Sequence, residues 1–458
     1  MKKYLIVSVM VVAIATQGTV YSAVTEKEAE QLGKNLTLFG AEQAGNAAGT
    51  IPPYTGGLPP TTAVPGWVKG SGRYDRSPYD NEKPLFSITS ANINKYAENL
   101  TEGQIALLKK YPDYRLNVYP SHRSVAWPDK MLSFCKKNAI NAKLTESGDG
   151  VVGAHSCVPF PVPKNGLEVQ WNTQLKPIGG HYIKLADSTS VIADGRGRST
   201  FIAQYTMNVV NLYQNTAVDK LETPNFQRRM AFYSDPPSKA GDVIMLSVSS
   251  NFDKQKSSAW IYSPGQRRVR LAPEFSYDSL ISQFDGELIW DSASGFQGRP
   301  DYFDWKLVGK KEVYIPYNNN RQAFAPLDKI TAKKSFIDPD LSRWELHRVW
   351  VVEMTLKPGA RHVDSRRTLY IDEDTWAIVA ADGYDHAGKL YRAVFNPVFL
   401  IWDRQSYYVE ENYYNLIKGS YVVVGSFNKP TSATLVDDNK KVNLNEFTAA
   451  AMESFGVR

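Results

Sequence analysis

Residues 344–391 contain three consecutive strand-like stretches, and the first of them alternates apolar and polar side chains. In the first of these, residues 348–356, one strand face is predicted to carry Trp350, Val352, Met354 and Leu356. Turns rich in Pro, Gly and Asp separate it from residues 367–372 and 376–380. A two-residue period interrupted by such turns is typical of an antiparallel meander. A long meander with one apolar face must either pack on a second layer or curl around an apolar interior.

The same kind of pattern predicts further elements on both sides of this meander. Strands are expected at residues 116–119, 167–171, 201–213, 243–249, 305–315 and 406–414, with a hairpin at 258–271. Helices are expected at residues 25–39, 101–108, 128–140 and 448–455. Residues 40–67 are rich in Pro and Gly, which is typical of a disordered linker. Their apolar side chains favour instead an extended arm that lies on the body.

The predicted strands continue past every candidate domain boundary, and the chain contains no internal repeat. We therefore expect a single domain over residues 23–458, mainly β with inserted helices (α+β), built on one large curved antiparallel sheet. A helical and Pro/Gly-rich arm, about residues 23–100, is expected to form its N-terminal part.

The first 22 residues have the pattern of a secretory signal peptide. Lys2 and Lys3 precede a short apolar stretch at residues 4–15, and cleavage is expected after Ser22. The alternative is an uncleaved N-terminal anchor. No other stretch approaches the ~18 apolar residues of a membrane helix. We therefore expect a soluble, exported product.

Two cysteines, Cys135 and Cys157, are consistent with export, because an oxidising compartment favours their pairing. The alternative is two free, buried thiols. The chain has no Cys-x-x-Cys motif, which disfavours redox catalysis.

The net charge argues against nucleic acid as a partner. It is +6, and it falls to about +4 when Lys2 and Lys3 are removed with the signal. So small an excess over this length makes no basic surface of the kind that nucleic acids require. Arg267, Arg268 and Arg270 follow a turn of the predicted hairpin. They indicate either a solvated face with ion pairs or a site for an anionic group.

No catalytic, metal or cofactor site is expected from the sequence motifs. The six histidines show no metal-ligand spacing, and nucleophile-elbow, dinucleotide and phosphate-loop motifs are absent. The acidic segment Asp372-Glu373-Asp374 lacks the glycine and the later glutamate of a calcium loop, so an acidic turn is the preferred interpretation. A catalytic triad or carboxylate pair assembled from distant residues would leave no mark in the sequence.

Several motifs together resemble the domain-of-unknown-function 1329 family. They are residues 116–123 (LNVYPSHR), 159–166 (PFPVPKNG), Trp171-Asn172, 302–317 with DWKLVG at 304–309, and 370–376 (YIDEDTW). The resemblance covers nearly the whole mature chain, from Leu36 to Arg458. Where a Trp-Asn-His motif is expected, this chain has Thr173, so no role of that histidine carries over.

This family is similar to the lipoprotein-sorting carriers LolA and LolB. The resemblance implies an incomplete antiparallel barrel, with helices at its mouth and a cavity for acyl chains. It also implies an inner-membrane exporter of the resistance-nodulation-division type and an outer-membrane protein as partners. It supplies no catalytic residues.

The function expected from these observations is a non-enzymatic carrier of a lipid or other hydrophobic molecule. It would work in the Gram-negative periplasm, either free or peripheral at the outer membrane. The alternation predicts that eight side chains line its cavity: Phe201, Tyr205, Met207, Trp350, Val352, Met354, Trp376 and Ile378. The alternatives are a periplasmic protein-interaction or sensory module, and a hydrolase with a distributed active site.

Overall fold

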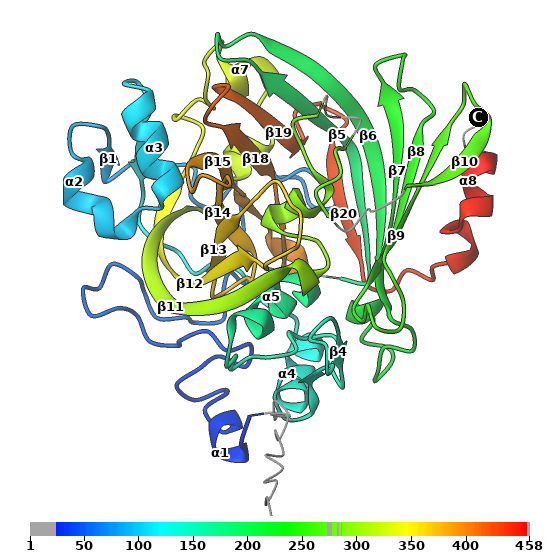
Figure 1. Cartoon of the computed structure of the whole chain (residues 1–458). Coiled ribbons are helices and arrows are strands. Elements are labelled where there is room, and N and C mark those ends of the chain that lie inside the picture. The colour runs from blue at the N-terminus through cyan, green and yellow to red at the C-terminus, as the bar shows by residue number, and fades with distance from the viewer. Residues whose placement is uncertain (1–23, 179, 273–276, 282–283, 285, 456–458) are drawn as a thin grey trace, which may run out of the picture.

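Sixteen strands form one continuous, strongly curved sheet in the computed structural model (Figure 1). The structure describes residues 24–178, 180–272, 277–281, 284 and 286–455, so the predicted signal peptide, residues 1–22, lies outside the described residues. None of the helices in these ranges combines the length and the apolar character that crossing a membrane requires.

The strands lie in the order β1-β2-β12-β13-β14-β15-β18-β19-β5-β6-β7-β8-β9-β10, with β11 also paired to β12 and β20 to β5. Their bounds are β1 (Phe86–Ile88), β2 (Leu116–Val118), β5 (Tyr182–Ala193), β6 (Ser199–Asn211), β7 (Asn225–Asp235), β8 (Val243–Ser249), β9 (Ser258–Ser263), β10 (Arg268–Ala272), β11 (Phe303–Pro316), β12 (Trp344–Leu356), β13 (Arg366–Asp372), β14 (Ile378–Tyr384), β15 (Leu390–Phe395), β18 (Glu411–Asn415), β19 (Ser420–Ser426) and β20 (Ala433–Asp437). Two separate hairpins are β3 (Lys143–Leu144) with β4 (Val151–Val152), and β16 (Val398–Ile401) with β17 (Ser406–Val409).

The pairing is antiparallel throughout the large sheet except for the parallel contact of β2 with β12. In the described part of the chain, the two ends of the strand order do not pair with each other, and the sheet stays an incomplete barrel. The long strands β5–β8 and the strands β11–β15 lie on different sides of the molecule, so that the sheet curves between them (Figure 1). The predicted fold class, mainly β with a large curved antiparallel sheet, is therefore confirmed.

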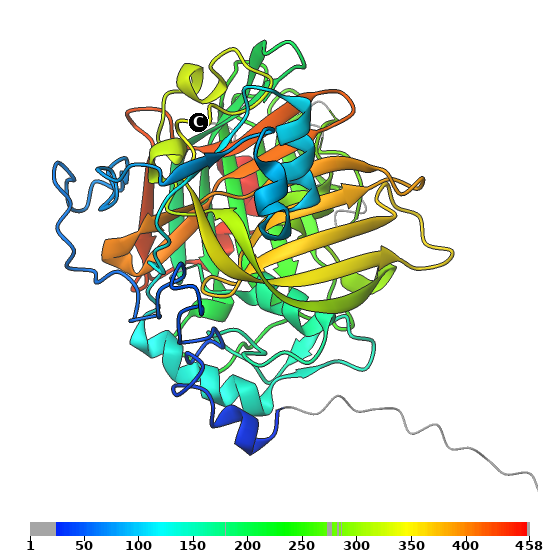
Figure 2. The same cartoon turned by 90° about the vertical axis from the view of Figure 1, so that its left-hand side faces the viewer.

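Helices are short and lie at the margins of the sheet (Figures 1 and 2). The α-helices are α1 (Glu26–Ala29), α2 (Ile93–Tyr96), α3 (Glu102–Lys110), α4 (Asp129–Asn141), α5 (Gly166–Leu175), α6 (Asn320–Ala323), α7 (Leu327–Thr331) and α8 (Ala449–Phe455). The 3-10 helices are η1 (Ala97–Asn99), η2 (Leu212–Gln214), η4 (Trp290–Gly295), η5 (Pro300–Tyr302), η6 (Trp402–Arg404) and η7 (Leu444–Glu446). The predicted helices at 101–108, 128–140 and 448–455 are confirmed as α3, α4 and α8.

The predicted meander is present as β12, β13 and β14. Its third strand begins at Ile378 rather than at residue 376, because Trp376 has a left-handed backbone with φ +57°. The indole of Trp376 is fully buried, and its Nε1 donates a hydrogen bond of 2.9 Å to the carbonyl of Phe39. Burial of this side chain therefore offsets the unfavourable backbone conformation in the turn.

The predicted strand at residues 167–171 is wrong, because this segment is the helix α5. Asn165 caps the helix, with its side-chain oxygen accepting a hydrogen bond of 2.9 Å from the Glu168 amide. Eight of the ten residues of α5 are buried, so its apolar positions do not follow the one-sided helical period. The alternating apolar residues Leu167, Val169 and Trp171 therefore belong to a helix that is buried on most sides, and they do not indicate a strand.

Two other predicted elements are shorter than expected. The helix predicted at 25–39 ends after α1, and at Gly33, with φ +83°, the chain turns back so that Leu32 and Leu36 form a bridge. The strand predicted at 406–414 is divided at Glu410 into β17 and β18, which belong to different sheets. In both places a local change of backbone direction interrupts a continuous apolar pattern.

Residues 40–67 form an extended arm that lies on the body, rather than a linker. Ile51 is buried, and the hydroxyl of Tyr54 donates to the Val125 carbonyl at 2.9 Å. The amide of Leu58 donates to the Ser124 carbonyl at 2.8 Å. The ring of Trp67 lies 4.9 Å from that of Trp402. The arm is therefore fixed by apolar burial and by hydrogen bonds along its length.

The predicted disulfide between Cys135 and Cys157 is present, and both residues are fully buried. It connects α4 to the loop that precedes α5. Asn138, one turn further along α4, donates side-chain hydrogen bonds to the carbonyls of His155 and Cys157. The disulfide and this side chain hold the same loop against the helix.

Helix α3 packs unusually close to β14 and β15 at Gly103. A Cβ atom there would lie 2.4 Å from the Asp382 carboxylate oxygen and 2.7 Å from Ala393. The Gly103 amide donates a 3.0 Å hydrogen bond to Asp382, and the hydroxyl of Tyr370 lies 3.4 Å from its other oxygen. Burial, together with the charge of nearby Glu102, raises the pKa of Asp382 to about 7.

This raised pKa predicts a pH-dependent loss of stability. A carboxyl whose pKa is higher in the folded than in the unfolded state stabilises the fold when protonated, and this contribution is lost as pH rises through about 7. Relative to the Asp382→Asn variant, the native protein should therefore lose about 2 kcal/mol of unfolding free energy between about pH 5 and about pH 7. Denaturant titrations at both pH values measure it, with Asp304→Asn at an exposed position as the control. An equal pH response of Asp382→Asn and the native protein would contradict the prediction.

Candidate functional site

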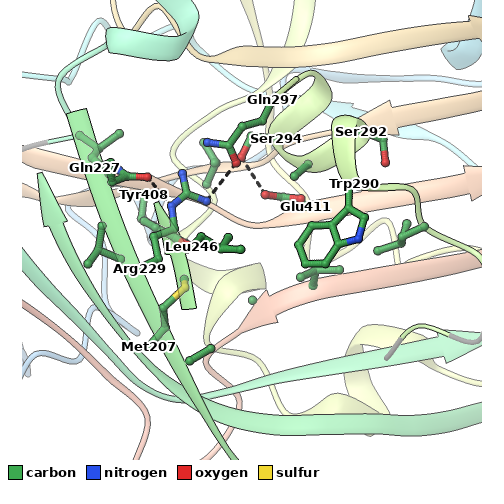
Figure 3. A pocket seen from close by; sticks show the side chains of 18 of the residues that line it. Met207, Gln227, Arg229, Leu246, Trp290, Ser292, Ser294, Gln297, Tyr408 and Glu411 are labelled. Carbon is green, nitrogen blue, oxygen red and sulfur yellow. Dashed lines mark hydrogen bonds between the residues drawn. The ribbon is translucent and has the colours of Figure 1, made fainter. Parts of the chain in front are cut away.

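A cavity of about 200 Å³ lies between the inner face of β6–β8 and the segment that contains η4 (Figure 3). Strands β17 and β18 complete its wall. Its volume is below the ~300–1,000 Å³ typical of sites for drug-sized ligands. The cavity as formed therefore holds a small molecule or one part of a longer one.

Three neighbouring strands supply one wall through their alternation. Their lining side chains are Tyr205, Met207 and Val209 of β6, Ala231 and Tyr233 of β7, and Ile244 and Leu246 of β8. The intervening residues Met230 and Met245 belong to a separate apolar cluster with Phe447 and Met452, where α8 packs on β8–β10. One face of these strands is thus covered by the C-terminal helix, and the other is left to the cavity.

The opposite wall comes from η4, its neighbouring residues and strand β17. Trp290 lies across the cavity from Met207 and Leu246 (Figure 3), and Phe296, Tyr408 and other apolar side chains extend this wall. Met207, Ala231, Leu246, Trp290, Tyr408, Val409 and Val424 are all half-buried although they are apolar. Apolar surface that faces an empty cavity is surface on which a guest molecule could gain free energy by burial.

A buried ion-pair network anchors η4 to the meander. Asp291 accepts a 2.8 Å hydrogen bond from His362 Nε2, and it lies 3.3 Å from the Arg367 guanidinium, which also pairs with Asp364. Arg367 Nη1 donates to the Gly295 carbonyl at 2.9 Å. Burial opposes ionisation of Asp291, but Arg367 and His362 hold its pKa below the usual value. The cavity wall therefore rests on charged contacts that exclude water.

Polar and charged side chains also line the cavity. Arg229 of β7 donates to the side-chain oxygens of Gln227 and Gln297, the latter at 3.1 Å (Figure 3). Lys176, which ends α5, donates from Nζ to the Thr173 carbonyl at 2.7 Å. Glu411 accepts hydrogen bonds from Ser294, at 2.8 Å, and from Tyr413. Among the described lining residues, the charged side chains are thus two cations and one carboxylate.

Burial lowers the pKa of both cations, because removal from water disfavours the charged form. The pKa of Arg229 lies below its usual value for this reason. Burial, and then repulsion by Arg229, lower the pKa of Lys176 to about 8. Attraction from Glu411 only partly offsets these effects on either cation.

Of the eight side chains predicted to line a cavity, the structure brings Tyr205 and Met207 to this one. Ligand contact by these two stays a prediction. Phe201 is not among the lining residues, because the register of β6 against β5 shifts between Ala203 and Phe201 and breaks the two-residue alternation. Its ring instead lies 6.0 Å from the Lys429 ammonium.

Of the other five predicted side chains, four lie in the main core and Trp350 packs against it. Val352, Met354 and Ile378 are buried, and α5 packs against β11 and β12 in this part of the sheet. The rings of Trp350 and Trp376 stack at 6.0 Å. The structure therefore places these five outside the lining of this cavity.

Sequence reasoning missed the polar lining residues Lys176, Arg229 and Glu411. Arg229 had a usable signal, because Gln227, Arg229, Ala231 and Tyr233 occupy alternate positions of β7. Lys176 and Glu411 had none, since Lys176 follows the end of α5 and Glu411 begins β18, and both reach the cavity only through tertiary structure.

The acidic segment forms the predicted turn, and its carboxylates are neutralised by cations. Asp374 accepts two hydrogen bonds from Arg123, at 2.8 and 2.6 Å. Glu373 pairs with Arg348 at 2.8 Å and with Lys310 at 2.7 Å. This turn is therefore part of a buried ion-pair network.

One group of possible metal ligands occurs among the described residues, at the same turn. It consists of His347, Asp372 and Asp374, whose ligand atoms lie within 4.8 Å of one another. Burial opposes protonation of His347, but Asp372 and Glu345 raise its pKa to about 9. A protonated imidazole lacks the lone pair that a metal ion needs, so the arrangement favours an ion pair.

A second cavity, of about 220 Å³, lies near β4. Loop residues with polar side chains form much of its wall, among them Glu222, Thr223, Asn251 and Lys254. It lacks the continuous apolar wall of the first cavity.

Comparison with known proteins gives one family and one close curated relative. A family model described as "Protein of unknown function (DUF1329)" matches residues 87–453. An uncharacterized protein of Pseudomonas aeruginosa, PA3922, is 39% identical over 454 residues, which cover 97% of this chain and 96% of that protein.

Solved structures with a similar fold have low sequence identity. A DUF1329 family protein from Desulfovibrio piger is 14% identical, with a TM-score of 0.40, and the match covers 60% of this chain and 92% of that one. A putative outer membrane lipoprotein-sorting protein domain from Vibrio parahaemolyticus is 10% identical, with a TM-score of 0.43 and coverage of 63% and 98%. A LolA superfamily protein from Nitrosomonas europaea, NE2245, is 10% identical, with a TM-score of 0.37 and coverage of 62% and 98%.

Proposed function

Because the chain belongs to the DUF1329 family of proteins of unknown function, we propose a function from its cavity: it is a non-enzymatic binding or carrier protein for a lipid or another hydrophobic molecule. The observation that carries this proposal is the apolar wall of the cavity, on which Met207, Leu246 and Tyr408 remain half-buried. Each methylene of a guest buried there would gain about 0.8 kcal/mol over water.

The place of action that we propose is the Gram-negative periplasm. The signal-like N-terminal sequence and the disulfide both support an exported protein. Acyl chains cross the aqueous space between two membranes only at a large free-energy cost, so a carrier with an apolar cavity would lower that cost. The family resemblance adds an inner-membrane exporter and an outer-membrane protein as proposed partners in lipid trafficking.

Native mass spectrometry of the purified protein, followed by solvent extraction, tests the proposal. Recovery of a lipid in stoichiometric amount is the expected result. An empty protein that captures a periplasmic protein would favour an interaction or sensory module instead. Turnover of ester or glycoside substrates would favour a hydrolase, for which Ser294 and Glu411 are the polar pair at the cavity.

Filling the cavity with a large side chain should abolish binding. Ala231 lines the cavity from β7, so Ala231→Trp would occupy space that the guest needs. We expect co-purified lipid to fall at least about ten-fold, since displaced methylenes each contribute about 0.8 kcal/mol. Ala63→Trp, at an exposed position of the arm, is the matched control and should retain its lipid. Retention of lipid by folded Ala231→Trp protein would exclude this cavity as the site.

A further inference from the structure

We propose that the guest is amphipathic and carries an anionic oxygen group, which binds between Arg229 and Lys176 while its apolar part lies along β6–β8. This inference rests on the proposed binding function and adds the chemical class of the molecule bound. A carboxylate or a phosphate ester on an alkyl chain has this chemistry.

The first support is the incomplete pairing of Arg229. Among the residues that the structure describes, no carboxylate lies within 4.0 Å of its guanidinium. Gln227 and Gln297 accept hydrogen bonds from Nε and Nη1, and no bond from Nη2 to a described residue is present. The two amides thus orient the planar guanidinium (Figure 3) and leave donors for a further acceptor.

The fully buried arginines of this protein show which partners a guanidinium removed from water ordinarily has. Arg123 pairs with Asp374 and Glu373, and Arg367 pairs with Asp364 and Asp291. A buried cation without a counter-ion is costly, and an arriving anion removes that cost. Arg229 is therefore in the position of a ligand-binding group, whereas Arg123 and Arg367 hold the fold together.

The second support is Lys176, which lines the same cavity from the end of α5. No carboxylate of the described residues forms a salt bridge with it, and its Nζ donates to the Thr173 carbonyl. Two of the three donors of the ammonium remain for a ligand. The repulsion between Lys176 and Arg229 is itself relieved by an anion placed between them.

The single carboxylate of the cavity does not complete the charge balance. Glu411 accepts hydrogen bonds from Ser294 and Tyr413, and these donors fix it on the η4 side of the cavity (Figure 3). With Lys176 and Arg229 both charged, the lining carries a net charge of +1 among its described residues. One anionic group on the guest would neutralise it.

A set of ligands with one alkyl chain and different head groups tests the inference. Delipidated protein is titrated with dodecanoate, dodecyl phosphate, dodecan-1-ol and dodecyltrimethylammonium, each below its micellar concentration, by calorimetry. At least one anion should bind about ten-fold or more tightly than the alcohol, which is the size of one charge-assisted hydrogen bond. The cation should bind most weakly. The tighter of the two anions identifies a carboxylate or a phosphate head.

Matched variants locate the effect. Arg229→Met keeps the length of the side chain, and it should reduce the preference for the anion over the alcohol to about two-fold or less, with affinity for the alcohol retained. Lys176→Met should reduce the same preference in part. Arg268→Met, at an exposed position of β10, should change none of the affinities.

The pH dependence of the affinity for dodecane-1-sulfonate gives an independent test. The charge of this ligand does not change with pH over the range used. Its affinity should be constant at lower pH and fall as pH rises above about 8, where Lys176 of the free protein loses its proton. Lys176→Met should remove this fall. An affinity of the native protein that does not change up to about pH 10 would contradict the role of Lys176.

The outcomes separate this inference from the function on which it rests. Equal affinity of the native protein for dodecan-1-ol and both anions would overturn the anionic head group and leave the carrier function standing. Absence of binding by every dodecyl compound would overturn both. A preference for anions that persists in Arg229→Met would also overturn the assignment to this site.

Discussion

Arg367→Met is expected to lower the free energy of unfolding by about 3–5 kcal/mol, because it removes the guanidinium that pairs with two buried carboxylates. Arg367 is almost fully buried and pairs with Asp364 and Asp291. Methionine retains the apolar stem but supplies neither a charge nor a hydrogen-bond donor. Chemical denaturation measures the loss. Because Asp291 belongs to η4, the same variant should weaken lipid binding by loosening one wall of the cavity.

The neighbouring Arg366 provides the control for this experiment. Its guanidinium pairs with Glu353 at 3.1 Å, but both side chains are about one-third exposed. Solvent screens such a pair, so Arg366→Met should cost about 1 kcal/mol or less. If the two variants lose a similar amount of unfolding free energy, burial does not decide how much each ion pair contributes to stability.

Removal of the disulfide, as Cys135→Ala with Cys157→Ala, is expected to lower the free energy of unfolding by about 3 kcal/mol. The bond closes a loop with a sequence separation of 22 residues, and its loss restores chain entropy to the unfolded state. Alanine fits the site without placing a new polar group in it, since both cysteines are fully buried. Thermal unfolding of the double variant, compared with the native protein, measures the effect.

The reducing agent dithiothreitol supplies the complementary control. It should lower the unfolding midpoint of the native protein towards that of the double variant, and it should leave the variant unchanged. If the double variant unfolds at the same temperature as the native protein, the disulfide contributes nothing to stability, and hydrogen bonds such as those of Asn138 and Tyr213 suffice to hold the loop.

The parts of the fold that sequence reasoning predicted are those in which side-chain alternation is strong. The second half of β12 and strand β10 are examples, because Val352 and Met354 in the one, and Val269 and Leu271 in the other, alternate with polar residues. Strand β5 has no such period, since a register shift at Asp187 and a run of small polar residues interrupt it. Strand β7 was missed for a related reason, because Gln227 and Arg229 occupy positions on its inner face.

Sequence patterns predicted lining residues on only one wall of the cavity. Tyr205 and Met207 were found because they alternate along a single strand. The wall opposite to them is formed by η4 and β17, which lie far from β6 in the sequence and carry no pattern that relates them to it. Val352 and Met354 satisfied the same alternation as Tyr205, yet α5 packs against their strand. A periodic apolar face therefore shows that something covers a strand, but not whether a helix or a guest molecule does so.

The pairing of β5 with β19 and β20 has a consequence for how the protein folds. Ala193 lies opposite Tyr421, and Ala186 lies opposite Ala433, so the two halves of the sheet are joined by strands from distant parts of the chain. Contacts of such long range form slowly, since a large loop must close before they gain any energy. During synthesis the chain cannot complete this seam until its last strands have left the ribosome. A chain still in synthesis would therefore keep one edge of β5 unpaired, and the sheet would be completed only after β19 and β20 are made.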